Sequence, residues 1–244
     1  MVRKISILLV ASLVFFSFVN AGLVAAEKEK LTIALVSEPT TLDPHKQWNP
    51  SSYYVYRNIF DNMVTRNSDG KIVPQVAESW NYIDQKTIDF KIRTNIKFHD
   101  GSSLTVDDVV FSVKRVIDPK FKSPQAGQFN TITDAKKINK NTVRLFTKVP
   151  YPVLLAQLVK LSIVPKAYIN KVGNDGLNRN PVGSGPYKFV AWKKRISTWV
   201  DRKQMGLFGT RQMAKLLSVF YIFPTKGNTN TRLGTWYPNI CSSC

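Results

Sequence analysis

Residues 87–116 constrain the fold more than any other stretch, because the spacing of their apolar side chains changes halfway. Ile88, Phe90 and Ile92 alternate with polar residues, which predicts a strand with one buried face. The sequence FHDG at residues 98–101 then predicts a turn, since glycine and aspartate favour tight reversals of the chain. A helix is expected directly after this turn.

The expected helix begins at Thr105, whose hydroxyl group suits an N-cap. Asp107 and Asp108 follow in the first turn, where the positive end of the helix dipole favours carboxylates. Adjacent side chains on a helix point ~100° apart, so we interpret these two aspartates as structural and not as a paired acid and base. The apolar stripe that would face the core consists of Val109, Val110, Val113 and Val116.

The composition allows a folded protein of one large domain or two small ones. The chain has 244 residues, of which 43% are hydrophobic, and this suffices for a substantial core. A formal net charge of +19 would favour nucleic acid or an anionic membrane as a partner. The lysines are scattered between apolar positions, however, and the sequence shows no zinc-finger spacing, aromatic stacking motif or basic helix. No nucleic-acid partner is therefore predicted.

Residues 1–26 are predicted to be a cleavable secretory signal peptide. Two basic residues precede an apolar run over residues 5–19, and small residues that suit cleavage end at Ala21 and at Ala26. The run is shorter than the ~20 residues that a membrane span needs, although an uncleaved anchor extending through Ala26 stays open. We expect a mature start at Glu27 and a periplasmic or other extracytoplasmic location.

The two cysteines, Cys241 and Cys244, form a C-x-x-C pair at the end of the sequence. Redox and zinc sites with this spacing need a surrounding fold, and a structural zinc ion needs four ligands. The sequence has no second C-x-x-C and no histidine pair to complete such a site. The pair is interpreted as incidental, and no metal site or cofactor is predicted.

The remaining pattern predicts a mixed α/β fold without a repeating βαβ unit. A proline-pinned loop at residues 37–45 should follow the first strand, with Pro44 holding Asp43 extended. A helix at residues 51–64 is expected to have Ser51 or Ser52 as its N-cap. The other expected elements are a strand at residues 31–36, a turn at 67–70, extended segments within 72–80, a turn at 81–84, strands at 142–147 and 187–190, and a short helix at 152–161.

Four motifs, taken in order, resemble those of the family 5 extracellular solute-binding proteins of ABC importers, the peptide- and nickel-binding group. The motifs are TLDPH at residues 41–45, IVPQVAESW at 72–80, the 87–115 stretch described above, and NPVGSGPYKFVAWKK at 180–194. The resemblance implies a periplasmic-binding-protein type II-like fold, in which two lobes close on a ligand by a hinge motion. It also implies a small peptide or other small solute as the ligand and a membrane permease as a partner. We expect a monomer.

The resemblance divides the chain into parts of a first lobe. Residues 27–47 are expected to be a first-lobe segment, residues 48–166 an inserted α/β subdomain, and residues 167–194 the return to the first lobe. Gly183 and Gly185 should form a tight turn in this return segment. A phosphate-binding loop is the alternative there, but no Lys-Ser or Lys-Thr follows the last glycine.

Ligand contacts are expected at five positions in loops near the lobe boundary. They are Glu38, Thr40, Trp48, Gln128 and Phe129. Each position has a structural alternative: Glu38 could accept backbone hydrogen bonds, Trp48 could belong to the core, and Phe129 could anchor its loop. No catalytic residue is predicted and the protein is not expected to be an enzyme, because His99 and Asp100 lie in a turn without a well-placed nucleophile.

After Lys194 the sequence departs from the family pattern. Residues 195–244 hold seven basic residues and one acidic residue, and their apolar side chains show no sustained period. We interpret them as an atypical basic tail of uncertain structure, produced by a frameshift or truncation, with the second lobe missing. Because a cleft needs two walls, ligand binding is then expected to be weakened. The alternative functions are a secreted cationic interaction protein and, less favoured, an envelope enzyme that uses His99.

Overall fold

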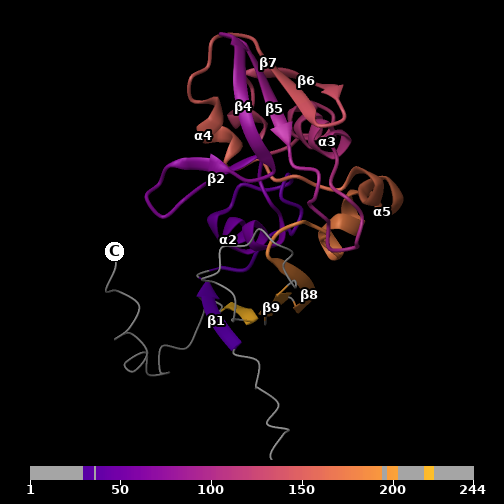
Figure 1. Ribbon diagram of the computed structural model, residues 1–244. Helices are drawn as coiled ribbons and strands as arrows, with labels where there is room; N and C mark the ends of the chain where they lie inside the picture. Colours follow the sequence, from indigo (N-terminus) through magenta and orange to yellow (C-terminus); the bar gives the residue numbers. More distant parts are fainter. Residues whose placement is uncertain (1–29, 36, 194–196, 203–216, 223–244) are drawn as a thin grey trace, which may run out of the picture.

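The computed structural model describes residues 30–35, 37–193, 197–202 and 217–222 (Figure 1). The predicted signal peptide, the C-x-x-C pair and most of the predicted tail lie outside these residues. The described part of the chain has a mixed α/β fold, as predicted. Of the helices in that part, none is long and apolar enough to cross a membrane.

A four-stranded antiparallel sheet forms the upper part of the molecule in Figure 1, with the strand order β4-β5-β7-β6. Its strands are β4 (Ala77–Asp84), β5 (Thr87–Ile92), β6 (Ile132–Asn139) and β7 (Thr142–Thr147). Ile88, Phe90 and Ile92 of β5 are all buried, so the predicted alternation is confirmed.

Helix α3 (Val106–Ile117) packs against this sheet and has the predicted N-cap, Thr105. The Asp108 carboxylate accepts hydrogen bonds from the Thr105 backbone N–H at 2.8 Å and from the Thr105 hydroxyl at 2.7 Å. Val109, Val113 and Val116 are fully buried. The prediction of a strand, a turn and a capped helix over residues 87–116 is therefore confirmed.

Helix α2 (Pro50–Ile59) is shorter than predicted at its C-terminal end, and its N-cap is neither Ser51 nor Ser52. Its N-cap is Asn49, whose side chain accepts a hydrogen bond from the Ser51 backbone N–H at 2.8 Å. The predicted continuation through Val64 is wrong because Met63 pairs like a strand residue, donating to the Leu161 carbonyl at 3.1 Å and accepting from Ala77 at 2.9 Å. The strands β2 (Val64–Arg66) and β3 (Ile72–Pro74) then form a small antiparallel hairpin.

Three further differences from the predicted elements concern β4, β6 and α5 (Lys166–Arg179). Strand β4 continues through residues 81–84, which were predicted to be a turn. Strand β6 and helix α5 were not predicted. Helix α5 has only two buried apolar residues, Ile169 and Leu177, and its helical conformation is broken at Gly173, so it lacks the continuous apolar stripe that would announce a helix. The predicted short helix is present as α4 (Leu154–Leu158).

A second sheet lies at the foot of the molecule in Figure 1, with α2 between it and the first sheet. Its order is β1-β10-β9-β8, where β1 (Lys30–Leu35) runs parallel to β10 (Leu217–Ile222), while β9 (Ser197–Arg202) is antiparallel to β10 and to β8 (Tyr187–Lys193). Strands β9 and β10 fall within the segment that we interpreted as an atypical tail.

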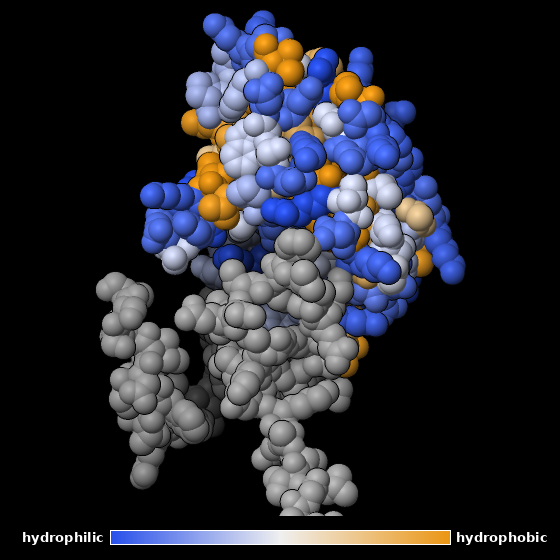
Figure 2. All heavy atoms as spheres, viewed as in Figure 1, coloured by the Kyte–Doolittle hydropathy of each residue, from blue (hydrophilic) through white to orange (hydrophobic). Residues whose placement is uncertain are grey.

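The buried apolar residues form two clusters. The first cluster fills the space between the β4-β5-β7-β6 sheet, α3 and α4, and includes Phe90, Val113, Phe129, Leu145 and Leu158. The second cluster surrounds α2 and includes Leu42, Tyr56, Phe60, Leu177 and Tyr187. On the face shown in Figure 2, hydrophilic side chains predominate and apolar ones occur in small separate groups.

Candidate functional site

The connection from β1 to α2 carries the TLDPH motif, whose residues 42–45 lie in the interior. Asp43, Pro44 and His45 are buried, and Leu42 belongs to the second cluster. The motif folds as a tight turn, because the Asp43 carboxylate accepts a hydrogen bond from the His45 backbone N–H at 3.0 Å and the Asp43 carbonyl accepts one from Lys46 at 3.1 Å. This turn brings a carboxylate and an imidazole into the core.

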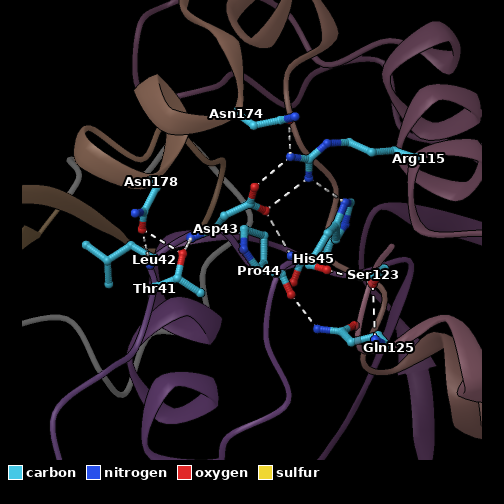
Figure 3. Close-up of polar contacts among 11 residues, drawn as sticks. Thr41, Leu42, Asp43, Pro44, His45, Arg115, Ser123, Gln125, Asn174 and Asn178 are labelled. Carbon is cyan, nitrogen blue, oxygen red and sulfur yellow. Dashed lines mark hydrogen bonds and ion pairs between the residues drawn. The ribbon is translucent and has the colours of Figure 1, made fainter. Parts of the chain in front are cut away.

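Arg115, near the end of α3, pairs with Asp43 in the interior (Figure 3). Its two terminal nitrogens donate to the two carboxylate oxygens of Asp43, Nη1 to Oδ1 at 3.0 Å and Nη2 to Oδ2 at 2.6 Å. The side chains of Arg115 and Asp43 are only 4% and 0% exposed. Nη2 also donates to Asn174 Oδ1 at 2.6 Å, and the Phe121 ring covers the guanidinium with its centroid at 4.0 Å. The two buried charges are thus paired with each other.

His45 joins the same network as a neutral imidazole. Its Nε2 lies 2.8 Å from the Ser162 carbonyl, which can only accept, so Nε2 carries the proton. The other nitrogen, Nδ1, then accepts from Arg115 Nη1 at 3.0 Å. Burial, and secondarily the Arg115 charge, lower the pKa of His45 to about 4. Both nitrogens are occupied, which gives His45 a structural role.

Two further elements hold the TLDPH segment from either side. After α3, the Ser123 hydroxyl donates to the His45 carbonyl at 2.6 Å, and Gln125 Nε2 donates to the carbonyls of Pro44 and Gln47. On α5, Asn178 Oδ1 accepts from the Thr41 hydroxyl at 2.6 Å and from the Leu42 backbone N–H at 2.8 Å. Residues 41–47 are therefore fixed by contacts from elements that are far apart in the sequence.

The turn that contains His99 is anchored to the glycine turn at residues 183–185. His99 Nε2 lies 2.9 Å from the Gly185 carbonyl, and the His99 backbone N–H donates to the Gly183 carbonyl at 2.8 Å. A Cβ atom at Gly183 would lie 2.0 Å from the Ile59 carbonyl oxygen, so only glycine fits where this turn crosses the end of α2. His99 thus contacts backbone, which favours scaffolding over catalysis.

Three predicted contact residues, Glu38, Thr40 and Trp48, lie on the connection between β1 and α2. Glu38 Oε1 accepts a hydrogen bond from the Trp192 indole at 2.9 Å. Thr40 is exposed, and its backbone N–H donates to the Ser52 hydroxyl at 3.1 Å. Trp48 is 49% exposed, and Lys160 Nζ lies 4.6 Å from the centroid of its ring. The alternative of a core position for Trp48 is wrong.

The other two, Gln128 and Phe129, lie after α3 at the end of the short helical turn η1 (Ala126–Gln128). Phe129 is fully buried in the first cluster, which matches its alternative as a loop anchor. The side-chain oxygen of Gln128 is buried without a hydrogen-bond partner. Glu38, Thr40 and Trp48 therefore share the segment between β1 and α2, whereas Gln128 and Phe129 lie at the first apolar cluster. Ligand contact at all five stays a prediction.

Sequence reasoning missed the network of Asp43, His45, Arg115, Asn174 and Asn178. One signal was available on α3, where Asp108, Ser112 and Arg115 follow the i, i+4, i+7 spacing and are all buried. Polar residues at that spacing beside an apolar stripe indicate buried partners elsewhere in the chain. The asparagines of α5 gave no comparable signal. Among the residues that the structure describes, no group of three or more His, Cys, Asp or Glu residues could hold a metal ion.

Known proteins show the same sequence pattern and fold. The model of the bacterial extracellular solute-binding proteins, family 5 Middle, matches residues 71–205, which extends 11 residues beyond Lys194. The periplasmic oligopeptide-binding protein OppA of Escherichia coli K12 is 33% identical over 194 residues, covering 71% of this chain. The periplasmic murein peptide-binding protein MppA of the same organism is 40% identical over 115 residues, covering 47% of this chain and 21% of MppA.

Solved structures agree with this similarity. DppA from Helicobacter pylori, in complex with the peptide STSA, has a TM-score of 0.70 and 26% identity, over 80% of this chain and 41% of DppA. NikZ from Campylobacter jejuni, in complex with Ni(L-His), has a TM-score of 0.72 over 81% of this chain and 40% of NikZ, and its 24% identity shows the fold alone.

The chain spans only part of these proteins, for example 36% of the length of OppA. Its mixed α/β fold corresponds to about 40% of the length of the matched structures, which have the periplasmic-binding-protein type II-like fold. The family model nevertheless covers more than half of the sequence and includes the strand, turn and capped helix of residues 87–116. The chain belongs to the bacterial extracellular solute-binding proteins, family 5.

Proposed function

We propose that this chain supplies one wall of the ligand site in the substrate-binding component of an ABC importer. The ligand would be an oligopeptide or a related small solute, captured outside the cytoplasmic membrane and passed to a membrane permease by a monomeric binding protein. Family membership supports this, as do the relatives' names: OppA and MppA are peptide-binding proteins, and GsiB of Pectobacterium atrosepticum, 27% identical over 221 residues, is a glutathione-binding protein.

The observation that carries the proposal is the contrast within the connection between β1 and α2. Its middle, residues 42–45 of the TLDPH motif, is buried and held by charged and polar contacts, whereas Thr40 just before the motif is exposed and Glu38 is half-buried. A rigid segment that presents a carboxylate, a hydroxyl and backbone groups suits recognition of a peptide, which offers an amino group and amide hydrogen-bonding groups. Glu38 and Thr40 are our strongest contact candidates.

Isothermal titration calorimetry tests this proposal on the full chain. The probes are the peptide STSA, reduced glutathione and the nickel–L-histidine complex. We expect saturable binding of STSA or glutathione, weakened by Glu38→Gln, because the substitution removes the charge that would pair with an amino group. The matched control is Glu78→Gln on β4, where an exposed glutamate pairs with Lys91. The proposal fails if folded protein binds none of the three, or if both variants change affinity equally.

A secreted cationic interaction protein is the second candidate, and the observation that favours it is the formal net charge of +19. Binding of this kind releases counterions and falls steeply with salt concentration. Retention on duplex DNA or anionic vesicles at 50 mM salt that is lost at 200 mM would support it. Over this range the affinity is expected to fall by about 10³-fold or more when several phosphates are contacted. Binding of STSA that changes little over this range would favour the importer function instead.

A further inference from the structure

We propose that Asn174 and Asn178 of α5 are positioning residues of the binding site, which fix residues 41–43 and thereby the end of the segment that carries Glu38 and Thr40. This inference rests on the proposed function for its meaning in ligand binding, but the positioning itself can be measured without a ligand. The two asparagines stand four residues apart, so they project from the same face of the second half of α5 toward the TLDPH segment.

The contacts of Asn178 determine the backbone just after Thr40. Its side-chain oxygen accepts two hydrogen bonds, from the Thr41 hydroxyl and from the Leu42 backbone N–H, at 2.6 and 2.8 Å. The Thr41 hydroxyl oxygen in turn accepts from the Asp43 backbone N–H at 3.1 Å. Residues 40–43 are themselves in neither a strand nor a helix, so side-chain oxygens take the place of backbone acceptors. Removal of the Asn178 oxygen would leave both donors without this acceptor, and the backbone at residues 41 and 42 would be less restrained.

Asn174 acts on the same segment through the ion pair. Its side-chain oxygen accepts from Arg115 Nη2 at 2.6 Å, on the opposite side of the guanidinium from His45 (Figure 3). The two terminal nitrogens of Arg115 also donate to the two carboxylate oxygens of Asp43. Asn174 therefore restrains the direction of the guanidinium, and through it the place of Asp43.

The break in α5 makes this arrangement possible. Gly173 has φ +72° and ψ 178°, a combination that residues with a Cβ atom rarely adopt. A Cβ atom at this position would have no other atom within 4 Å. The requirement for glycine is therefore conformational. The first half of α5 is tied to α3, because the Lys166 backbone N–H donates to Asp108 Oδ1 at 2.9 Å. Because the helix is broken at Gly173, the second half of α5 can take a direction different from the first half, and its two asparagines face the TLDPH segment.

Hydrogen exchange of backbone amides, followed by mass spectrometry on the full chain, tests the positioning directly. Asn178→Leu keeps the shape of the side chain but removes the acceptor, whereas Asn178→Asp keeps an acceptor oxygen. We expect Asn178→Leu to speed exchange in peptides that cover residues 40–43 by roughly tenfold, with no change in β5, and Asn178→Asp to restore the slow exchange. Asn170→Leu, at an exposed position of the same helix, is the matched control and should leave both regions unchanged.

A second variant covers the case in which Asn178→Leu does not fold. Thr41→Val removes one of the two donors to Asn178 and also the acceptor of the Asp43 backbone N–H, without changing the size of the side chain. It should therefore also speed exchange over residues 40–43 and leave β5 unchanged. Unchanged exchange at residues 40–43 in these variants, or an equal increase in β5, overturns the positioning role, because the second result indicates general destabilisation.

Ligand binding supplies the functional readout. STSA should bind the Asn174→Leu and Asn178→Leu variants roughly tenfold more weakly than the wild-type chain, with Asn178→Asp and Asn170→Leu close to wild type. Wild-type affinity in both leucine variants would overturn their role in binding. If the wild-type chain binds no STSA, glutathione or nickel–L-histidine, the proposed function fails and the role in binding fails with it, while the exchange data still decide whether the asparagines position the segment.

Discussion

The buried ion pair between Asp43 and Arg115 makes the sharpest prediction about stability. Arg115→Met removes the charged end and keeps most of the apolar stem. Asp43, which is 0% exposed, would keep one of its hydrogen bonds in this network, from the His45 backbone N–H, and would lose both bonds to the guanidinium. Because an unpaired buried charge remains, we expect the free energy of unfolding to fall by about 3–5 kcal/mol.

A second ion pair of similar geometry provides the comparison. Arg144 donates to Asp89 at 2.6 and 2.8 Å, but the two side chains are 30% and 19% exposed. Solvent reaches this pair and screens its charges, so Arg144→Met should lower the free energy of unfolding by clearly less than Arg115→Met does. The double variant Asp43→Asn with Arg115→Met removes both charges of the buried pair and keeps an acceptor for His45. It should therefore recover at least about 2 kcal/mol relative to Arg115→Met alone.

Urea unfolding monitored by far-UV circular dichroism measures these differences, with the wild-type chain and the three variants at one pH and salt concentration. The reasoning is refuted if Arg115→Met costs no more than Arg144→Met. It is also refuted if the double variant is as unstable as Arg115→Met, because the loss would then come from packing and not from the unpaired charge.

Two further predictions concern His45 and Gly183. Burial lowers the pKa of His45 to about 4 in the folded chain, whereas in the unfolded chain it is near 6.5. Between these values the unfolded chain binds more protons than the folded chain. The free energy of unfolding should therefore fall by roughly 3 kcal/mol as pH drops from about 6.5 to 4. Urea titrations at several pH values check this, and His45→Gln should flatten the slope; an equal slope in the variant contradicts the assignment. Gly183→Ala should lower the midpoint of thermal unfolding strongly, because the added Cβ meets the Ile59 carbonyl oxygen at 2.0 Å, whereas Gly127→Ala, with nothing within 4 Å, should shift it little; similar midpoints for both would show that the close packing is absent.

Local patterns made residues 87–116 predictable. The alternation of Ile88, Phe90 and Ile92, the FHDG turn and the Thr105 cap each depend on neighbours within a few residues, and the structure confirms them. The helix predicted to reach Val64 failed for a different reason. Its last residues are apolar at helical spacing, but the backbone of Met63 pairs with Leu161, which lies about a hundred residues further along the chain. No local pattern reports that partner.

The polar network was less predictable than the fold. Asp43 and Arg115 are 72 residues apart in sequence, and Thr41 and Asn178 are 137 apart, so their pairing depends on the complete packing of α3 and α5. The broken helix α5 supplied little signal of its own, because Gly173 interrupts it and only Ile169 and Leu177 are buried apolar residues. Of the predicted contacts, Glu38 and Thr40 precede the network in sequence and bond to Trp192 and Ser52, while Phe129 lies in the first cluster.

Nuclear magnetic resonance of the Trp192 indole N–H tests the central claim most directly, because this group donates to Glu38 Oε1 at 2.9 Å. The chain is labelled with ¹⁵N, and the signal is assigned by Trp192→Phe. If residues 38–40 form part of a peptide site, addition of STSA should shift the Trp192 signal in a saturable way and leave the signal of Trp80, which packs against the first cluster, in place. An unchanged Trp192 signal at saturating STSA would contradict the account.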